Sequence, residues 1–268
     1  MSIPLDKKVK RPLYFTESVK ERSLTTWFVH LPLDKGRKCM DKRLCALGAA
    51  GRAVVENINH DPKSAIDVGQ AHGLIVSSIQ QQFGTNYPII AGRHNEMNGD
   101  RPPTYWFICH TDGSAALSWQ KFSMCVGFIL AGRPMYAMVI APGLHPHPFV
   151  AHRDFGCCCC NGAARPVLWH LHDDRPLQRE QNPPTCQPHL TAGVRIIAKT
   201  TAYEFFDHAK IWELAAGALL VRECGGVTAC LDGAPIPWNQ VDLPPLIFAA
   251  SDGMASKANR AVIPLIAP

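Results

Sequence analysis

The chain has 268 residues, of which 47% are hydrophobic and 18% are charged, and its formal net charge is +5 with a pI of about 8.6. This length and composition suit one globular domain or two closely packed halves. No run approaches the roughly 20 apolar residues of a membrane helix, and the first 25 residues, charged and interrupted by Pro4 and Pro12, do not resemble a signal peptide. The sequence therefore predicts a cytoplasmic protein without a membrane partner.

The N-terminal segment carries scattered charges and no sustained hydrophobic periodicity. We interpret residues 1–43 as an extension that precedes a domain over residues 44–268. A cluster of lysines and arginines between Lys7 and Lys38 could contact nucleic acid or anionic lipid. No aromatic platform or nucleic-acid motif follows it, so a solvated tail is the favoured interpretation and a nucleic-acid partner is not expected.

The next elements follow from hydrophobic spacing and from breaks. Apolar residues near helical spacing predict helices over residues 42–59 and 64–83, which end at Asp61-Pro62 and at Gly84. Short apolar runs then predict strands over residues 87–91, 105–109, 122–130, 134–141 and 150–153.

Four consecutive cysteines, Cys157–Cys160, belong to a total of 11, which we interpret as reduced thiols. Zinc sites usually separate paired ligands by two to four residues, and successive side chains of a strand point to opposite faces. The favoured interpretation is a run of small residues before a hairpin turn at Asn161-Gly162, and a metal site is the alternative.

The second half begins with a polar, proline-rich stretch. Residues 168–192 are interpreted as an exposed loop, and the apolar run over residues 194–198 predicts a strand. A helix over residues 212–224 ends at Gly225-Gly226. Strands over residues 227–230 and 246–250 and a last helix over residues 254–262 complete the predicted elements.

Two motifs resemble the signatures of the inositol monophosphatase family. The segment Trp106–Ser114 is similar to the first signature, which runs Trp, apolar, apolar, Asp, Pro, apolar, Asp, Gly, Thr. The segment Trp212–Pro235 is similar to the second, a metal-binding Asp before Ala-Ala-Gly, an amphipathic helix, a Gly-Gly stop and an Asp-Gly-x-Pro turn. The resemblance covers about residues 44–262 and implies an α/β fold, a layered α-β-α-β-α sandwich of the inositol monophosphatase and sugar phosphatase type.

The family comprises magnesium-dependent phosphomonoesterases, so the resemblance implies a small phosphorylated metabolite as substrate, Mg²⁺ as cofactor and a homodimer. It also implies roles for individual residues. The metal ligands would be Asp112, the Thr111 carbonyl, Glu213 and, at an altered position, Cys109. Ser114 and Asp67 would be catalytic. Gly113, Ser114 and, at another altered position, Arg93 would contact the phosphate.

Ser114 replaces the family's Thr and keeps its hydroxyl group, whereas three other positions depart from the family in charge, in ligand type or in length. Cys109 replaces an Asp, and soft sulfur is a poor ligand for Mg²⁺. Arg93 replaces a metal-binding Glu, so it should repel Mg²⁺ and could bind phosphate directly. Together these two changes remove two negative charges and add one positive charge, so the net charge of the site rises by about three units relative to the family. Glu213 replaces an Asp with a longer side chain, and a displacement of about an ångström can cost about 100-fold in rate.

Two functions stay open. The first is a hydrolase, a divalent-metal-dependent phosphatase with a weakened or altered site, in which Mn²⁺ or Zn²⁺ could replace Mg²⁺ at a softer set of His94, Cys109, Asp112 and Glu213. The second is a non-catalytic member of the fold, an anion-binding scaffold or the product of a decayed gene. Local structural roles also stay open: Glu213 fits a first-turn helix acid, Ser114 an N-cap and Asp112 a turn before glycine.

Overall fold

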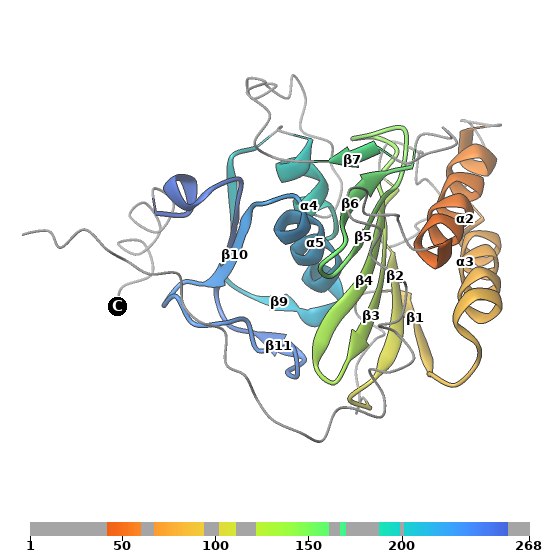
Figure 1. Cartoon of the computed structure of the whole chain (residues 1–268), viewed down its shortest axis with the longest axis horizontal. Helices are drawn as coiled ribbons and strands as arrows, with labels where there is room; N and C mark the ends of the chain where they lie inside the picture. Colours follow the sequence, from red (N-terminus) through yellow and green to blue (C-terminus); the bar gives the residue numbers. More distant parts are fainter. Residues whose placement is uncertain are drawn as a thin grey trace, which may run out of the picture. The chain divides into compact units, whose positions relative to one another are not determined.

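The computed structural model describes residues 42–59, 67–93, 102–110, 122–160, 167–169, 188–198 and 201–256. The chain divides into two compact units, residues 1–39 and 40–268, and every described residue belongs to the second. In this unit, helices and sheets alternate in layers (Figure 1). The predicted layered α/β fold is confirmed.

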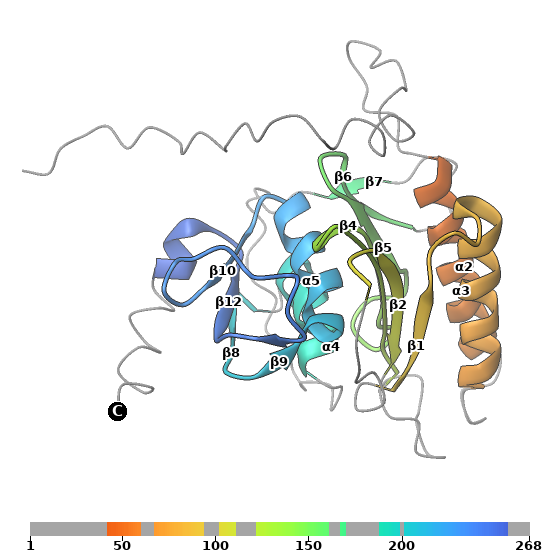
Figure 2. The same ribbon diagram turned by 90° about the horizontal axis from the view of Figure 1, so that it is seen from below.

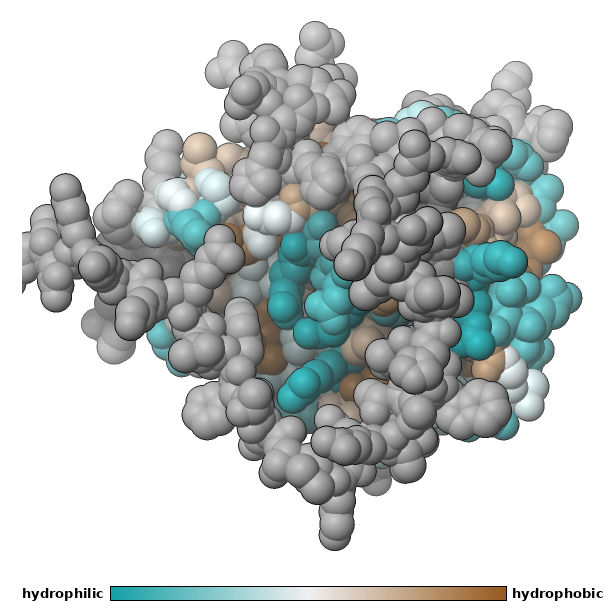
Figure 3. Space-filling model, viewed as in Figure 1, coloured by the Kyte–Doolittle hydropathy of each residue, from teal (hydrophilic) through white to brown (hydrophobic). Residues whose placement is uncertain are grey.

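The first layer is the helix pair α2 (Lys42–Asn59) and α3 (Val68–Phe83), which covers one face of a seven-stranded sheet (Figure 2). The outward side of this pair carries many hydrophilic residues, as the right of Figure 3 shows. None of the described helices is long and apolar enough to span a membrane.

The strands of the large sheet lie in the order in which they occur along the chain. They are β1 (Ile89–Arg93), β2 (Tyr105–His110), β3 (Met124–Leu130), β4 (Arg133–Ile140), β5 (Phe149–His152), β6 (Gly156–Cys159) and β7 (Val167–Trp169). β1 and β2 are parallel, and the other neighbours are antiparallel. The carboxyl ends of β1 and β2 therefore meet at one edge, where Arg93 pairs with His110.

Both faces of this sheet are buried, which explains why β2 is an almost uninterrupted apolar run. All six residues of β2 are buried. Trp106 contacts the ring of Phe83 in α3, with centroids 4.7 Å apart, whereas Phe107 and Cys109 join the core on the opposite face. The described part of the first signature, Trp106–His110, thus lies inside the core.

The second helix pair, α4 (Pro188–Ile197) and α5 (Ile211–Glu223), lies between the large sheet and a three-stranded antiparallel sheet. That smaller sheet contains β8 (Tyr203–Phe206), β12 (Leu246–Ala249) and β10 (Val227–Cys230), and β9 (Ala209–Lys210) pairs with β11 (Asp242–Leu243). Because α5 is covered by both sheets, all its residues from Ile211 to Val221 are buried, and it is apolar on nearly every side.

α4 and α5 approach each other at two glycines. A Cβ atom added to Gly193 in α4 would lie 2.5 Å from the Cα of Gly217 in α5. Contacts this short between backbones are possible only without side chains. The two glycines therefore set how closely the helices pack.

The strand predicted over residues 194–198 is wrong, because these residues form the second half of α4. Leu190, Val194 and Ile197 recur at helical spacing and are at most 1% exposed. The short β-branched run favoured a strand, but packing against α5 overrides that local preference. The exposed loop predicted over residues 168–192 is also wrong at both ends: β7 extends to Trp169, and α4 begins at Pro188 with Leu190 fully buried.

Other boundaries agree more closely. The helix predicted over residues 42–59 is confirmed as α2, and the strand over residues 227–230 as β10. α3 begins at Val68 after the N-cap Asp67 rather than near residue 64. Residues 252–256 are helical, and the rest of the predicted last helix lies outside the described residues, as does the turn at Asn161-Gly162.

The cysteine run occupies β6 and its end, with alternating side chains. Cys157 faces α5, where Cys224 is its hydrogen-bonding neighbour, and Cys160 faces α2, where its Sγ lies against Gly48. Burial is the largest cause that raises the pKa of Cys158 and of Cys160 to about 12. These side chains are protonated at neutral pH and act as small apolar groups.

Candidate functional site

The first signature is described only in part. Cys109 and His110 end β2, and Arg93 ends β1, although its side chain is not among the described ones. The other predicted residues of this signature lie outside the described residues, namely Thr111, Asp112, Gly113 and Ser114, together with His94. Their roles stay predictions.

Cys109 lies in the second strand of the sheet, within the core and not on the surface. Its side chain is fully buried, and its backbone pairs with Gly92 in β1 and with Cys125 in β3. The thiol therefore faces the α4–α5 side beside the Cys125 thiol.

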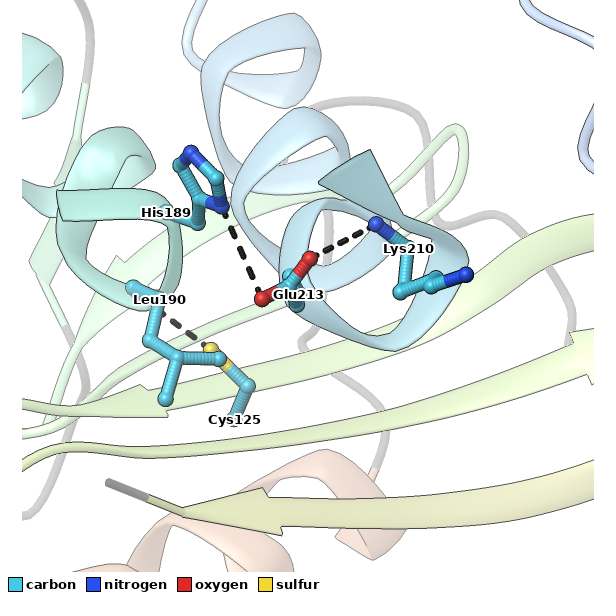
Figure 4. Close-up of polar contacts among 5 residues, drawn as sticks. All are labelled: Cys125, His189, Leu190, Lys210 and Glu213. Carbon is cyan, nitrogen blue, oxygen red and sulfur yellow. Dashed lines mark hydrogen bonds and ion pairs between the residues drawn. The ribbon is translucent and has the colours of Figure 1, made fainter. Parts of the chain in front are cut away.

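Glu213 lies in the first turn of α5, and both of its carboxylate oxygens have partners (Figure 4). The backbone N–H of Lys210 donates to Oε2 over 2.6 Å, and Nδ1 of His189 lies 3.5 Å from Oε1. The residue is only 7% exposed. Glu213 thus caps its own helix and joins it to the first turn of α4.

Cys125 connects this carboxylate to the signature strand. Its Sγ donates to the carbonyl of Leu190 in α4 over 3.1 Å. Burial, and to a smaller extent the negative charge of Glu213, raises the pKa of the Cys125 thiol. Since Cys125 pairs with Cys109 across β2 and β3, the fold brings the two signatures close together.

Asp67 lies at the same end of the sheet as Arg93. It is the exposed N-cap of α3, and its Oδ1 accepts a hydrogen bond of 2.9 Å from the backbone N–H of Gln70. One turn later, the ring of His72 contacts that of His110, with centroids 4.7 Å apart. Burial, and less strongly His110, lowers the pKa of His72 to about 4, so His72 is neutral at pH 7.

No protein-family model matches the chain, and no curated protein matches it by sequence. Solved structures do match. An inositol monophosphatase from Anabaena aligns with a TM-score of 0.59 and 14% identity over 83% of this chain and 96% of its own. The enzyme from Thermotoga maritima aligns with a TM-score of 0.56 and 17% identity over 85% of this chain and 100% of its own.

The chain has the inositol monophosphatase fold. A third structure, SaIMPase-II bound to 2′-AMP, agrees, with a TM-score of 0.54 and 13% identity over 82% of this chain and 95% of its own. The resemblance inferred from Trp106–Ser114 and Trp212–Pro235 is thereby confirmed for the fold. Activity is a separate question, because one fold can carry different chemistries or none.

The described residues by themselves do not fit the Mg²⁺ site of an inositol monophosphatase. Within the described ranges, no group of three or more His, Cys, Asp or Glu side chains could hold a metal ion. Mg²⁺ requires hard oxygen ligands in octahedral geometry, whereas Cys109 offers a buried thiol and Glu213 offers oxygens that already have partners.

His189 and Cys125, which lie next to Glu213 in the structure, were not identified from the sequence. His189 fell in a stretch interpreted as loop, and Cys125 in an apolar strand, so neither carried a motif. The register of β2 with β3 and the packing of α4 on α5 place both beside Glu213.

A cavity in the described part of the chain lies at the start of β2. It has a volume of about 410 Å³ and begins at Tyr105, the opposite end of β2 from Cys109. Its lining, which includes Ile129, Ile211 and Trp238, contains no charged side chain. We therefore do not assign the phosphate site to it.

Replacing Asp67 with Ala should lower the free energy of unfolding by about 1 kcal/mol, because the cap on α3 is lost. Asp67→Asn should retain most of the cap, since its amide oxygen can accept the same hydrogen bond. Urea denaturation of both variants measures the difference. If Asp67→Asn keeps the stability but loses phosphate release, Asp67 is catalytic as well as capping; equal stability of Asp67→Ala and the unaltered protein would contradict the capping role.

Proposed function

We propose that this chain binds a small phosphate monoester at the edge of the sheet where β1 and β2 end, and that its divalent-metal-dependent hydrolysis of that ester is severely weakened. The observation that carries the proposal is the position of Glu213. It lies in the first turn of α5, close to the strand pair that leads into Asp112, but its carboxylate is bound by Lys210 and His189.

The class of ligand is supported by the structures of this fold. SaIMPase-II has been seen with 2′-AMP and with inositol monophosphate, both of which are small phosphate monoesters. In this chain the first turns of α4 and α5 lie side by side, and the positive ends of helix dipoles favour anions. We propose that Gly113, Ser114 and Arg93 contact the phosphate.

The remaining roles are proposals of the same kind. Asp112, the Thr111 carbonyl and Glu213 would supply oxygen ligands, and Cys109 would be at most a soft ligand. Ser114 and Asp67 would orient the attacking water. Mg²⁺ is the expected cation, with Mn²⁺ or Zn²⁺ as substitutes. We also propose that residues 1–43 extend the domain and that the protein is a cytoplasmic homodimer.

A second candidate function is binding of the phosphate monoester without turnover. It is favoured by the engagement of both Glu213 oxygens, because a carboxylate that caps a helix and contacts an imidazole is not arranged as an open metal ligand. The positive charge of Arg93 would then neutralise the phosphate in place of a metal ion.

Phosphate release should separate the two candidates. The panel would contain 2′-AMP, inositol monophosphate and adenosine 3′,5′-bisphosphate, each with Mg²⁺, Mn²⁺ or Zn²⁺, and the Thermotoga maritima enzyme would be assayed in parallel. We expect release at least about 100-fold slower than that enzyme, as the displaced carboxylate predicts. Asp112→Asn should abolish the release, whereas Asp232→Asn, in an exposed turn, should not change it.

Each other outcome has a distinct meaning. No release, together with a melting temperature that rises when the esters are added, would support binding without turnover. Release as fast as that of the Thermotoga maritima enzyme would contradict the weakened site. If the protein releases no phosphate and its melting temperature does not change when the esters are added, both candidates are contradicted.

A further inference from the structure

We infer that the side chain of His189 takes the place of a metal ion as the partner of Glu213, so that a divalent cation can bind Glu213 only by displacing the imidazole. We refer to His189, Glu213, Lys210 and Cys125 as the α4–α5 clamp (Figure 4). The inference concerns metal binding alone and does not depend on whether the chain hydrolyses phosphate esters.

The first step is the pairing itself. Nδ1 of His189 faces Oε1 of Glu213 at 3.5 Å, while the other ring nitrogen points away from the carboxylate (Figure 4). A neutral imidazole with its proton on Nδ1 and an imidazolium both present an N–H group to the oxygen. The contact is therefore available whichever of these forms is present.

The second step is the position of His189, which the packing of the helices determines. His189 and Gly193 are four residues apart in α4, and Glu213 and Gly217 are four residues apart in α5. The contact between His189 and Glu213 and the contact between the two glycines thus lie on successive turns of α4 and α5, and the two helices run parallel. The ring of Phe206 also packs edge-on against His189, with centroids 5.3 Å apart.

The third step is that hydrogen bonds hold the other carboxylate oxygen of Glu213 and the neighbouring backbone of α4. The Lys210 N–H holds Oε2, and the Cys125 thiol fastens the Leu190 carbonyl of α4 to β3. These hydrogen bonds and the imidazole contact join α4, α5 and β3 in addition to their apolar packing. Because Oε2 already accepts the capping hydrogen bond of Lys210, a cation would have to reach Oε1, where it would compete with the imidazole of His189, and this competition opposes its binding.

The test is the affinity for Mn²⁺ without any substrate, measured from the electron paramagnetic resonance signal of free Mn²⁺. His189→Ala should bind Mn²⁺ at least about tenfold more tightly than the unaltered protein, because Oε1 becomes available; changes around metal ligands commonly alter affinity by about 10–100-fold. His189→Ser should give the same gain and serves as the second variant if His189→Ala does not fold.

The matched control is His208→Ala. His208 also faces a carboxylate, with Nε2 3.4 Å from Asp207, but its side chain is 91% exposed. This variant should bind Mn²⁺ as the unaltered protein does. Adding Glu213→Gln to His189→Ala should remove the gain. The inference is overturned if neither His189 variant binds more tightly, or if the gain persists with Glu213→Gln.

Discussion

Mg²⁺-dependent phosphate release should increase by at least about 100-fold when Arg93→Glu, Cys109→Asp and Glu213→Asp are introduced together. The three substitutions introduce the acidic residues that the family has at these positions, replace a soft ligand by a hard one and lower the net charge of the site by about three units. The shorter side chain at residue 213 also withdraws the carboxylate from its contacts with Lys210 and His189. Release from 2′-AMP or inositol monophosphate measures the gain.

Stability and metal dependence provide the controls for this variant. An Asp at residue 109 would be fully buried in the sheet, so without metal the variant should melt at a lower temperature than the unaltered protein. Mg²⁺ should raise the melting temperature of the variant but not that of the unaltered chain. Asp112→Asn in the variant should abolish the gained activity. A variant that folds and responds to Mg²⁺ but releases no more phosphate would show that another part of the site limits catalysis.

Gly193→Ala should lower the free energy of unfolding by about 1–3 kcal/mol, the usual cost of overfilling a packed interior. The added methyl group would lie 2.5 Å from the Cα and 2.6 Å from the carbonyl oxygen of Gly217. These are backbone atoms, which cannot turn aside as a flexible side chain can. α4 must therefore move away from α5, which would also lengthen the contact between His189 and Glu213.

Gly73→Ala is the matched control, because it makes the same chemical change in another helix. A Cβ atom at this exposed residue of α3 would meet nothing within 4 Å, and alanine favours a helix over glycine by about 1 kcal/mol. This variant should be more stable than the unaltered protein. Urea denaturation with equal m-values measures both changes. Equal stability of the two variants would mean that the glycine contact does not determine the helix packing.

The position of Glu213 also explains why the departures from the family belong together. A site without the family's carboxylates at residues 93 and 109 has less negative charge to hold a cation, so the remaining carboxylate needs other partners when it is buried. Lys210 and His189 provide them. We propose that Arg93, Cys109 and the α4–α5 clamp are parts of one change in the electrostatics of the predicted site.

The sequence by itself determined many of the helices and strands, and the resemblance of two of its motifs implied the layered fold. The apolar run before Cys109 predicted a strand, and the apolar residues after Lys210 predicted a helix. These patterns are local, so they can be read without knowing any contact, whereas burial of both faces of the strand and of nearly every side of the helix is seen only in the structure. The breaks at Pro62, Gly84 and Gly225 likewise marked helix ends.

Only the tertiary structure decided what Glu213 contacts. Its partner His189 lies in α4, part of which was predicted as a strand because residues 194–198 include a β-branched run. The helix forms because Leu190, Val194 and Ile197 pack in the interior with α5. A carboxylate can bind a cation, cap a helix or contact an imidazole with the same atoms. Which of these occurs depends on groups distant in sequence, and packing, rather than local pattern, brings them within reach.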